Sequence, residues 1–177
     1  MTAPSATRPA AGEFLPYFAT YIDKVPDGDV IAVLESGIGT TRKALARVTE
    51  ERAGYRYAEG KWSIKEVLGH MSDTERIFTY RLLAFARGDA GPLPGFDENS
   101  YTPAQESDRV PLAWLLDEFV AVRAATLALL KVLPPKAWER RGVASKHPLS
   151  ARAAAWIIAG HEIHHRRVLE ERYLTAL

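Results

Sequence analysis

Three of the five histidines in this chain lie in one short segment near the C-terminus, residues 160–166, which read GHEIHHR. His161 and His165 are four residues apart, so on a helix both imidazoles project from the same face, about one turn apart. Two neutral imidazoles at this spacing can bind one divalent metal ion. Because the chain has no cysteine, a transition-metal site here would consist of nitrogen and oxygen ligands.

His70 is the candidate for a third ligand. It lies in the second turn of a helix predicted over about 63–87, on the apolar stripe expected to face inward. Alone it would be interpreted as an ordinary hydrogen-bonded core histidine, and that alternative applies to all three. Two adjacent buried imidazoles without a metal must each find a separate partner, which favours metal binding for the pair. We therefore predict a metal site formed by His70, His161 and His165.

The other two histidines are not expected to be ligands. His164 would project roughly 100° away from His165 on a helix, so it should lie beside the site or at the surface. His147 precedes a proline in a predicted loop and has no motif around it, which is typical of a solvated residue.

The string His161-Glu162-x-x-His165 also matches the zinc-peptidase signature, in which the glutamate is the general base. Only twelve residues follow His165, and no Gly-x-x-His is among them. A peptidase of this type usually holds an extended substrate along a strand edge, and no strand is predicted here. Glu162 would lie about 100° around the helix from His161 and could face outward. The peptidase interpretation stays an alternative.

Three protein ligands and an open position are typical of a catalytic metal site, because a structural zinc site normally has four ligands. Such a site lowers the pKa of a bound water to about 7 or deprotonates a bound thiol. In the loop after the second predicted helix, four residues supply polar groups that could reach the site, Asp97, Glu98, Asn99 and Tyr101, and of these Asp97, Asn99 and Tyr101 are the candidate substrate-binding residues. The alternative is a turn whose Asp-Glu-Asn cluster satisfies its own hydrogen bonds. Arg76 and Arg81 on that helix could bind a carboxylate, but we expect them to pair with acidic neighbours.

Four segments with helical periodicity must position these residues. Ser63 and Glu66 form a capping-box pattern at the start of the second segment, and Gly88 should end it. The third must stop before the proline pair at Pro134. The predicted helices cover about 29–52, 63–87, 111–133 and 150–173.

No segment shows the sustained alternation of a strand, so the predicted fold is all-α. The expected architecture is an antiparallel four-helix bundle with a long crossover loop, residues 88–110, between the second and third helices. Counted from the helix starts, His70 lies less deep than His161 and His165. On that count the three side chains meet only if the second and fourth helices are offset along their axes.

Length and composition are those of a single globular domain. The 177 residues are 47% hydrophobic, which suffices for one core. We assign residues 1–27 to an N-terminal tail and lead-in and residues 28–177 to the bundle. The net charge of +1 gives no field for nucleic acid or an anionic membrane, and no apolar run could span a bilayer. The N-terminus lacks signal-peptide features, so we expect a cytoplasmic protein.

Three stretches in order resemble the DinB/YfiT-like family. Residues 62–73 read WSIKEVLGHMSD, residues 93–101 read LPGFDENSY, and residues 161–166 read HEIHHR. They resemble the start of the family's second helix, the loop after that helix, and its terminal His-x-x-x-His helix. The resemblance covers the chain from about residue 28 onward. It implies an antiparallel four-helix bundle in which His70, His161 and His165 bind a divalent metal ion.

The resemblance also implies an activity. Some members of this family are transferases or isomerases that use bacillithiol or mycothiol, and homodimers are common among them. We therefore predict a metal-dependent enzyme, a thiol transferase or a hydrolase, that activates a low-molecular-weight thiol or water for reaction with a small-molecule substrate. Zinc or nickel is the expected metal. The alternatives are a non-catalytic metal-binding stress-response module and the zinc peptidase.

Overall fold

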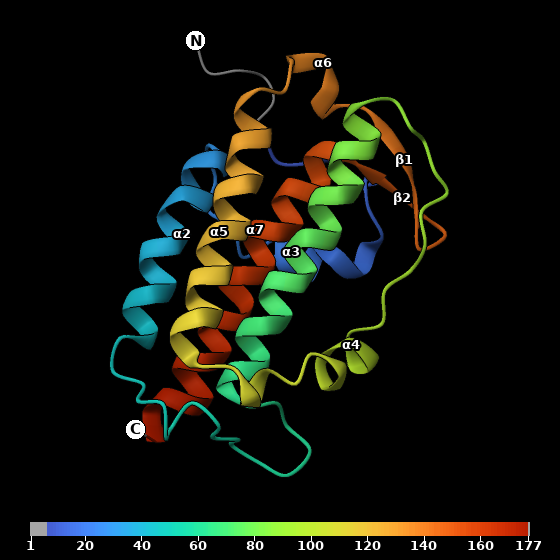
Figure 1. The fold of residues 1–177 in the computed structure, drawn as a ribbon. Coiled ribbons are helices and arrows are strands. Elements are labelled where there is room, and N and C mark those ends of the chain that lie inside the picture. Colours follow the sequence, from blue (N-terminus) through green and yellow to red (C-terminus); the bar gives the residue numbers. More distant parts are fainter. Residues whose placement is uncertain (1–6, 177) are drawn as a thin grey trace.

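Four long helices form the body of the protein in the computed structural model, which describes residues 7–176. The predicted all-α four-helix bundle is confirmed (Figure 1). Within the described residues, no helix is long and apolar enough to cross a membrane. The four helices are α2 (Val30–Leu45), α3 (Ile64–Ala86), α5 (Leu112–Lys131) and α7 (Ala151–Val168).

The long crossover loop sets the direction of the helices. Residues 87–111 run along the outside of the bundle from one end to the other, so α3 and α5 point the same way (Figure 1). The helices α2 and α7 point the opposite way, and α3 packs against both α7 and α5. The loop carries the short helix α4 (Glu98–Ala104) and a 3-10 turn, Ser107–Arg109.

Local caps fix the helix ends much as predicted. The Ser63 side chain accepts a hydrogen bond from the Glu66 amide while the Glu66 carboxylate accepts one from the Ser63 amide, which is the predicted capping box. After α3, Gly88 has a φ of 94°, as expected for a residue that ends a helix. Ser150 caps α7 by accepting from the Ala153 amide. α7 continues into a π-helical turn, Leu169–Tyr173.

The first helix is shorter than predicted, because α2 ends at Leu45 and not near residue 52. Tertiary contacts replace its last turns. The Glu50 carboxylate pairs with Lys65 and accepts a hydrogen bond from the Leu112 amide at 2.9 Å. Since Pro111 has no side chain that could cap α5, Glu50 satisfies an amide at the start of that helix.

The prediction that the chain has no strand is wrong. β1 (Arg141–Ala144) and β2 (His147–Ser150) pair as an antiparallel hairpin before α7, following the short helix α6 (Pro135–Trp138). The two turn residues, Ser145 and Lys146, have φ values of 53° and 68°. A two-residue hairpin turn of this kind normally contains Asn-Gly or Asp-Gly, so the sequence carried no turn signal.

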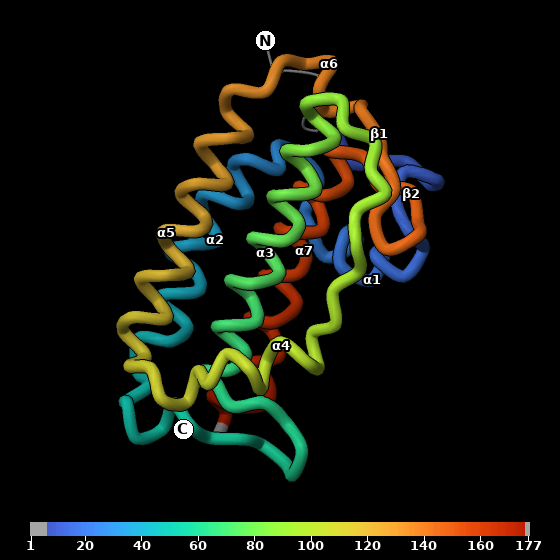
Figure 2. Tube along the Cα trace, turned by 45° about the vertical axis from the view of Figure 1, so that its right-hand side comes forward, coloured from blue at the N-terminus to red at the C-terminus, as the bar shows by residue number. Residues whose placement is uncertain are grey.

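The segment before α2 contacts the bundle. After a 3-10 turn (Pro16–Phe18), α1 (Ala19–Ile22) lies against α7, on the same side as the hairpin (Figure 2). A Cβ atom on Gly160 would lie 2.2 Å from the Tyr21 carbonyl oxygen, so only glycine allows this approach. The assignment of residues 1–27 to a tail and lead-in stays a prediction. Residues 1–6 of it lie outside the described residues.

Two apolar clusters form the core, one toward each end of the bundle. Arg123 on α5 lies where they meet, because it donates to the Leu34 carbonyl in one cluster and packs on the Phe119 ring in the other. It forms ion pairs with Glu75 of α3 and Glu162 of α7. A buried charged cluster therefore links α3, α5 and α7.

Candidate metal centre

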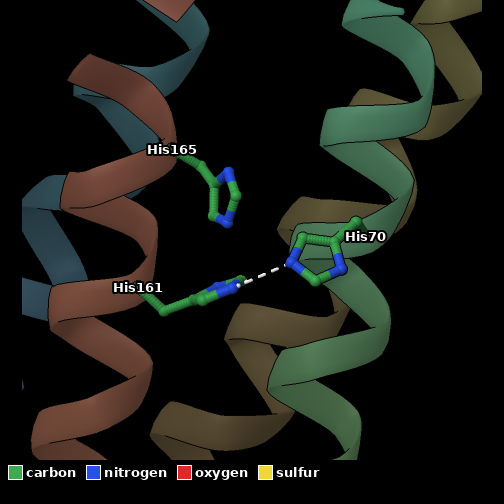
Figure 3. A group of neighbouring side chains, drawn as sticks. All are labelled: His70, His161 and His165. Atoms are coloured by element: carbon green, nitrogen blue, oxygen red, sulfur yellow. Dashed lines mark hydrogen bonds between the residues drawn. The ribbon is translucent and has the colours of Figure 1, made fainter. Parts of the chain in front are cut away.

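The three predicted histidines meet between α3 and α7, with their rings facing one another (Figure 3). One ring nitrogen from each of His70, His161 and His165 lies within 4.8 Å of the others. The Nε2 atoms of His70 and His161 are 3.0 Å apart.

The expected axial offset between the helices is not needed, because α3 and α7 are antiparallel (Figure 1). His70 is near the start of α3, and the other two histidines are near the end of α7. The start of α3 lies beside the end of α7, where the Tyr173 hydroxyl donates to the Trp62 carbonyl at 2.7 Å. Antiparallel packing alone brings the three residues to one level.

Burial keeps these imidazoles neutral. His70 is 6% exposed and His161 is 5% exposed, while His165 is half-buried. Burial lowers the pKa of His70 to about 4 and the pKa values of His161 and His165 well below their usual range. Neighbouring histidines lower all three further. The neutral ring, with a free nitrogen lone pair, is the form that binds a metal.

Among the residues that the structure describes, the rings of His70, His161 and His165 form no hydrogen bond except the one between His70 and His161. Separate partners, which a set of ordinary core histidines would need, are thus missing. Two nitrogens bound to one tetrahedral ion at the usual bond lengths would be about 3.3 Å apart. The nitrogens observed here lie 3.0 Å apart in one pair and within 4.8 Å in all pairs, a range that includes this value.

The remaining histidines lie outside the group of converging rings, as predicted, although His147 is in a strand and not in the predicted loop. His164 is beside the site, with its ring 4.9 Å from that of His165 and 5.4 Å from that of Tyr21. His147 is exposed on β2. Neither belongs to the group of converging ring nitrogens.

Glu162 does not face outward, contrary to the expectation from its helical angle. It is buried, accepts from the Thr41 hydroxyl at 2.8 Å and pairs with Arg123 at 2.7 Å. Its carboxylate occupies the space that a Cβ on Gly37 would take, so α2 approaches α7 closely there. Both oxygens of this carboxylate are engaged by Thr41 and Arg123, which removes the main support for a peptidase.

A cavity of about 140 Å³ opens beside the histidines. His70 and His161 form one wall, and Arg81 and Ser145 are further from them along α3 and the hairpin turn. The rest of the lining comes from the N-terminal segment, the crossover loop and the two central helices: Tyr17, Phe18, Tyr21, Thr74, Phe78, Phe96, Glu98 and Ile157.

The predicted substrate-binding residues do not line this cavity. Asp97 caps α4 by accepting from the Asn99 amide, and both side chains are exposed. Tyr101 packs on Phe96, with ring centroids 5.0 Å apart. Their contact with substrate stays a prediction, and the loop residues that reach the cavity are Phe96 and Glu98.

Sequence reasoning missed Tyr21 as a cavity residue, and it named Arg81 as a possible carboxylate-binding residue but favoured pairing with an acidic neighbour. The Tyr21 ring is 5.3 Å from that of His161, but its segment was assigned to a lead-in. The spacing of Tyr17 and Tyr21, four residues apart with hydroxyls at 3.2 Å, was the signal that could have indicated a helical face. Arg81 was expected to pair with an acidic neighbour, but among the described residues it bonds only to the Pro94 carbonyl and the Ser145 hydroxyl.

The fold and the site together define a class: a helical bundle whose antiparallel central helices hold three converging histidines. A family model described as the DinB superfamily matches residues 34–169. The chain belongs to the DinB superfamily.

A solved structure supports the fold. YfiT from Bacillus subtilis aligns with a TM-score of 0.75 and 19% sequence identity, covering 83% of this chain and 85% of that one. It is described as a probable metal-dependent hydrolase with an unusual four-helix bundle topology. No curated protein matches this chain.

Proposed function

We propose that His70, His161 and His165 bind one divalent metal ion and that the protein is a metal-dependent hydrolase. One observation carries this proposal: three largely buried, neutral imidazoles converge beside a cavity and have no hydrogen-bond partner besides each other among the described residues. YfiT is described as a probable metal-dependent hydrolase, so hydrolysis is the first activity to test.

The residues present would supply three neutral nitrogen ligands to a divalent ion, and two of them, His70 and His161, line the cavity. A divalent ion with three neutral imidazole ligands lowers the pKa of a water or thiol in the open position, which provides a nucleophile at neutral pH. Thr74 lies one turn after His70 on α3, lines the cavity and has a buried hydroxyl without a partner in the described part of the chain. Its role would be to donate a hydrogen bond to the substrate.

Tyr21 lines the cavity next to His161. Burial raises the pKa of its phenol, so the group is neutral at physiological pH and can donate a hydrogen bond. Trp62 covers His70 with a ring separation of 4.7 Å. These two aromatic rings pack on His161 and His70 and restrict the orientation of the imidazoles.

The test measures metal binding and activity in the same set of variants. Alanine substitution of any one of His70, His161 and His165 should lower zinc affinity by at least about tenfold. His164→Ala and His147→Ala are the matched controls and should bind one equivalent as the wild type does. Stoichiometry is measured by mass spectrometry under native conditions and affinity by calorimetry. Full affinity in His70→Ala would overturn the three-ligand site.

Activity separates the remaining candidates. Turnover of a small activated ester such as 4-nitrophenyl acetate, lost in His165→Ala and kept in His164→Ala, would support the hydrolase. If turnover needs a thiol and an electrophile such as 1-chloro-2,4-dinitrobenzene, the site activates a low-molecular-weight thiol of the bacillithiol or mycothiol type. Metal binding without either activity would leave a non-catalytic stress-response module.

Three further properties belong to this proposal. The nitrogen ligand set suits zinc or nickel, and metal analysis of the purified protein decides between them. We also propose a homodimer, which light scattering tests, and a cytoplasmic location, which fractionation tests.

A further inference from the structure

We propose that Arg81 binds the carboxylate of a small organic acid, whose reacting group lies at the histidine end of the cavity. The part about the reacting group rests on the function proposed above. Carboxylate binding at Arg81 does not, and it can be tested without a metal.

Arg81 is a buried cation without an acidic partner. It is 4% exposed, and no Asp or Glu in the described residues forms an ion pair with it. Burial lowers the pKa of Arg81, and no neighbouring carboxylate offsets that effect. A guanidinium nevertheless stays charged in proteins. Buried charges are normally paired, so this one lacks a counter-ion that a ligand can supply.

The donors of Arg81 are only partly used. Nη2 donates to the Pro94 carbonyl and to the Ser145 hydroxyl, both at 3.0 Å. Those two bonds fix the guanidinium, which also packs on the Phe78 ring at 4.9 Å. The Nε–H and both Nη1–H groups have no partner in the described residues, and Arg81 lines the cavity.

The hairpin turn supplies one of the groups that hold Arg81, and its backbone conformation there is unfavourable. Ser145, which accepts from Arg81, has a φ of 53° and is followed by Lys146 at 68°. Left-handed conformations are unfavourable for residues other than glycine, and such positions concentrate at ligand sites. The strained residue here is the one that contacts the buried cation.

Arg81 lies far enough from the histidines to bind the other end of a substrate. It follows His70 by eleven positions on α3, an axial distance of roughly 16 Å between the two Cα atoms. An arginine side chain on a helix extends back toward the N-terminus, which shortens this gap. Four apolar side chains border the cavity: Phe18, Phe78, Phe96 and Ile157.

The size and charge of the cavity indicate a monoanion. Its volume of about 140 Å³ is close to that of an engineered cavity, about 150 Å³, that binds benzene. Glu98 also lines the cavity without pairing with Arg81, so its negative charge opposes a doubly charged phosphate more than a carboxylate. The substrate class is therefore a small carboxylic acid with an apolar or aromatic body.

The experiment titrates benzoate into the full-length protein by calorimetry, in the metal-free and the zinc-loaded form. Benzamide is the neutral control of the same shape, and phenyl phosphate is the dianionic one. Wild type should bind benzoate at least tenfold more tightly than either. Arg81→Met should lose that preference in both forms, Arg81→Lys should keep part of it, and Glu98→Gln should strengthen benzoate binding.

Unfolding in urea checks that Arg81→Met is folded. Equal benzoate affinity in folded Arg81→Met and wild type would overturn the proposal, as would tighter binding of phenyl phosphate or benzamide. If Arg81→Met alone does not fold, Arg81→Lys and Glu98→Gln still decide it, because unchanged benzoate affinity in both would overturn it. Failure of the metal proposal has a separate sign, namely that wild-type protein binds no zinc.

Discussion

At the scale of single residues, Arg123 and its two carboxylates show what a buried charge requires. Arg123 is 0% exposed, and Glu75 and Glu162 each pair with it. Burial alone would lower the pKa of Arg123, but the two carboxylates raise it above its usual range. The guanidinium thus stays charged and joins three helices, whereas Arg81, which is 4% exposed, pairs with no carboxylate in the described residues.

Glu162→Gln tests whether this glutamate is structural. It keeps the shape of the side chain but removes one charge from the cluster, and Arg123 keeps Glu75. We expect the free energy of unfolding to fall by about 3 kcal/mol, at the lower end for a broken buried pair. Urea unfolding measures this, and zinc stoichiometry should not change.

Glu118→Gln is the matched control, because Glu118 pairs with Arg76 on the surface, where a pair contributes about 1 kcal/mol or less. If Glu162→Gln keeps full stability but loses zinc or activity, Glu162 belongs to the reaction and the peptidase alternative returns.

At the scale of elements, the helices could be predicted because their signals are local. Ser63 and Glu66 are three residues apart and cap α3 by themselves. The end of α2 could not be predicted, because Glu50 lies beyond the helix and contacts Lys65 and Leu112, two residues that are distant from it in sequence. Such tertiary contacts override helical periodicity.

The residues of the site likewise fall into those that local spacing predicts and those that tertiary contacts place. Helical spacing predicted the approach of His161 and His165, and the shared inward stripe indicated His70. The lining from the hairpin has no such period, and in the segment before α2 only the four-residue spacing of Tyr17 and Tyr21 could have indicated a helical face. Tyr21 reaches the site only because Gly160 lets its backbone approach α7, and Ser145 only because two residues adopt left-handed φ values.

Two glycine substitutions should change stability in opposite directions. Gly160→Ala places a Cβ 2.2 Å from the Tyr21 carbonyl oxygen, so α1 must move, and we expect a loss of about 1 to 3 kcal/mol. Gly39→Ala in α2 meets nothing within 4 Å and should gain about 0.5 to 1 kcal/mol from helix propensity. Thermal unfolding of both variants is the measurement. A gain in stability for Gly160→Ala would mean that α1 does not pack on α7 as described.

At the scale of the whole molecule, a bound metal should stabilise the fold by mass action. A ligand that binds only the folded state at a free concentration of 100 times its Kd adds about 2.7 kcal/mol. For a domain of this size, that raises the Tm by roughly 5 to 10 °C. We expect this shift on adding zinc to metal-free wild type, and its loss in His165→Ala. Differential scanning calorimetry tests it, and an equal shift in the variant would place zinc elsewhere on the protein.

The sequence distance between His70 and His161 has a consequence for the unfolded chain. The two residues are 91 positions apart, and the interval contains the crossover loop, α5 and the hairpin. An ion bound to both would close this interval into a ring and reduce the conformational entropy of the chain, as a disulfide does. The chain has no cysteine and therefore no disulfide, whereas the ion would be a cross-link that binds and dissociates reversibly. Supply or removal of metal would then change the conformational entropy of the unfolded chain over about half of its length, and with it the free energy of unfolding.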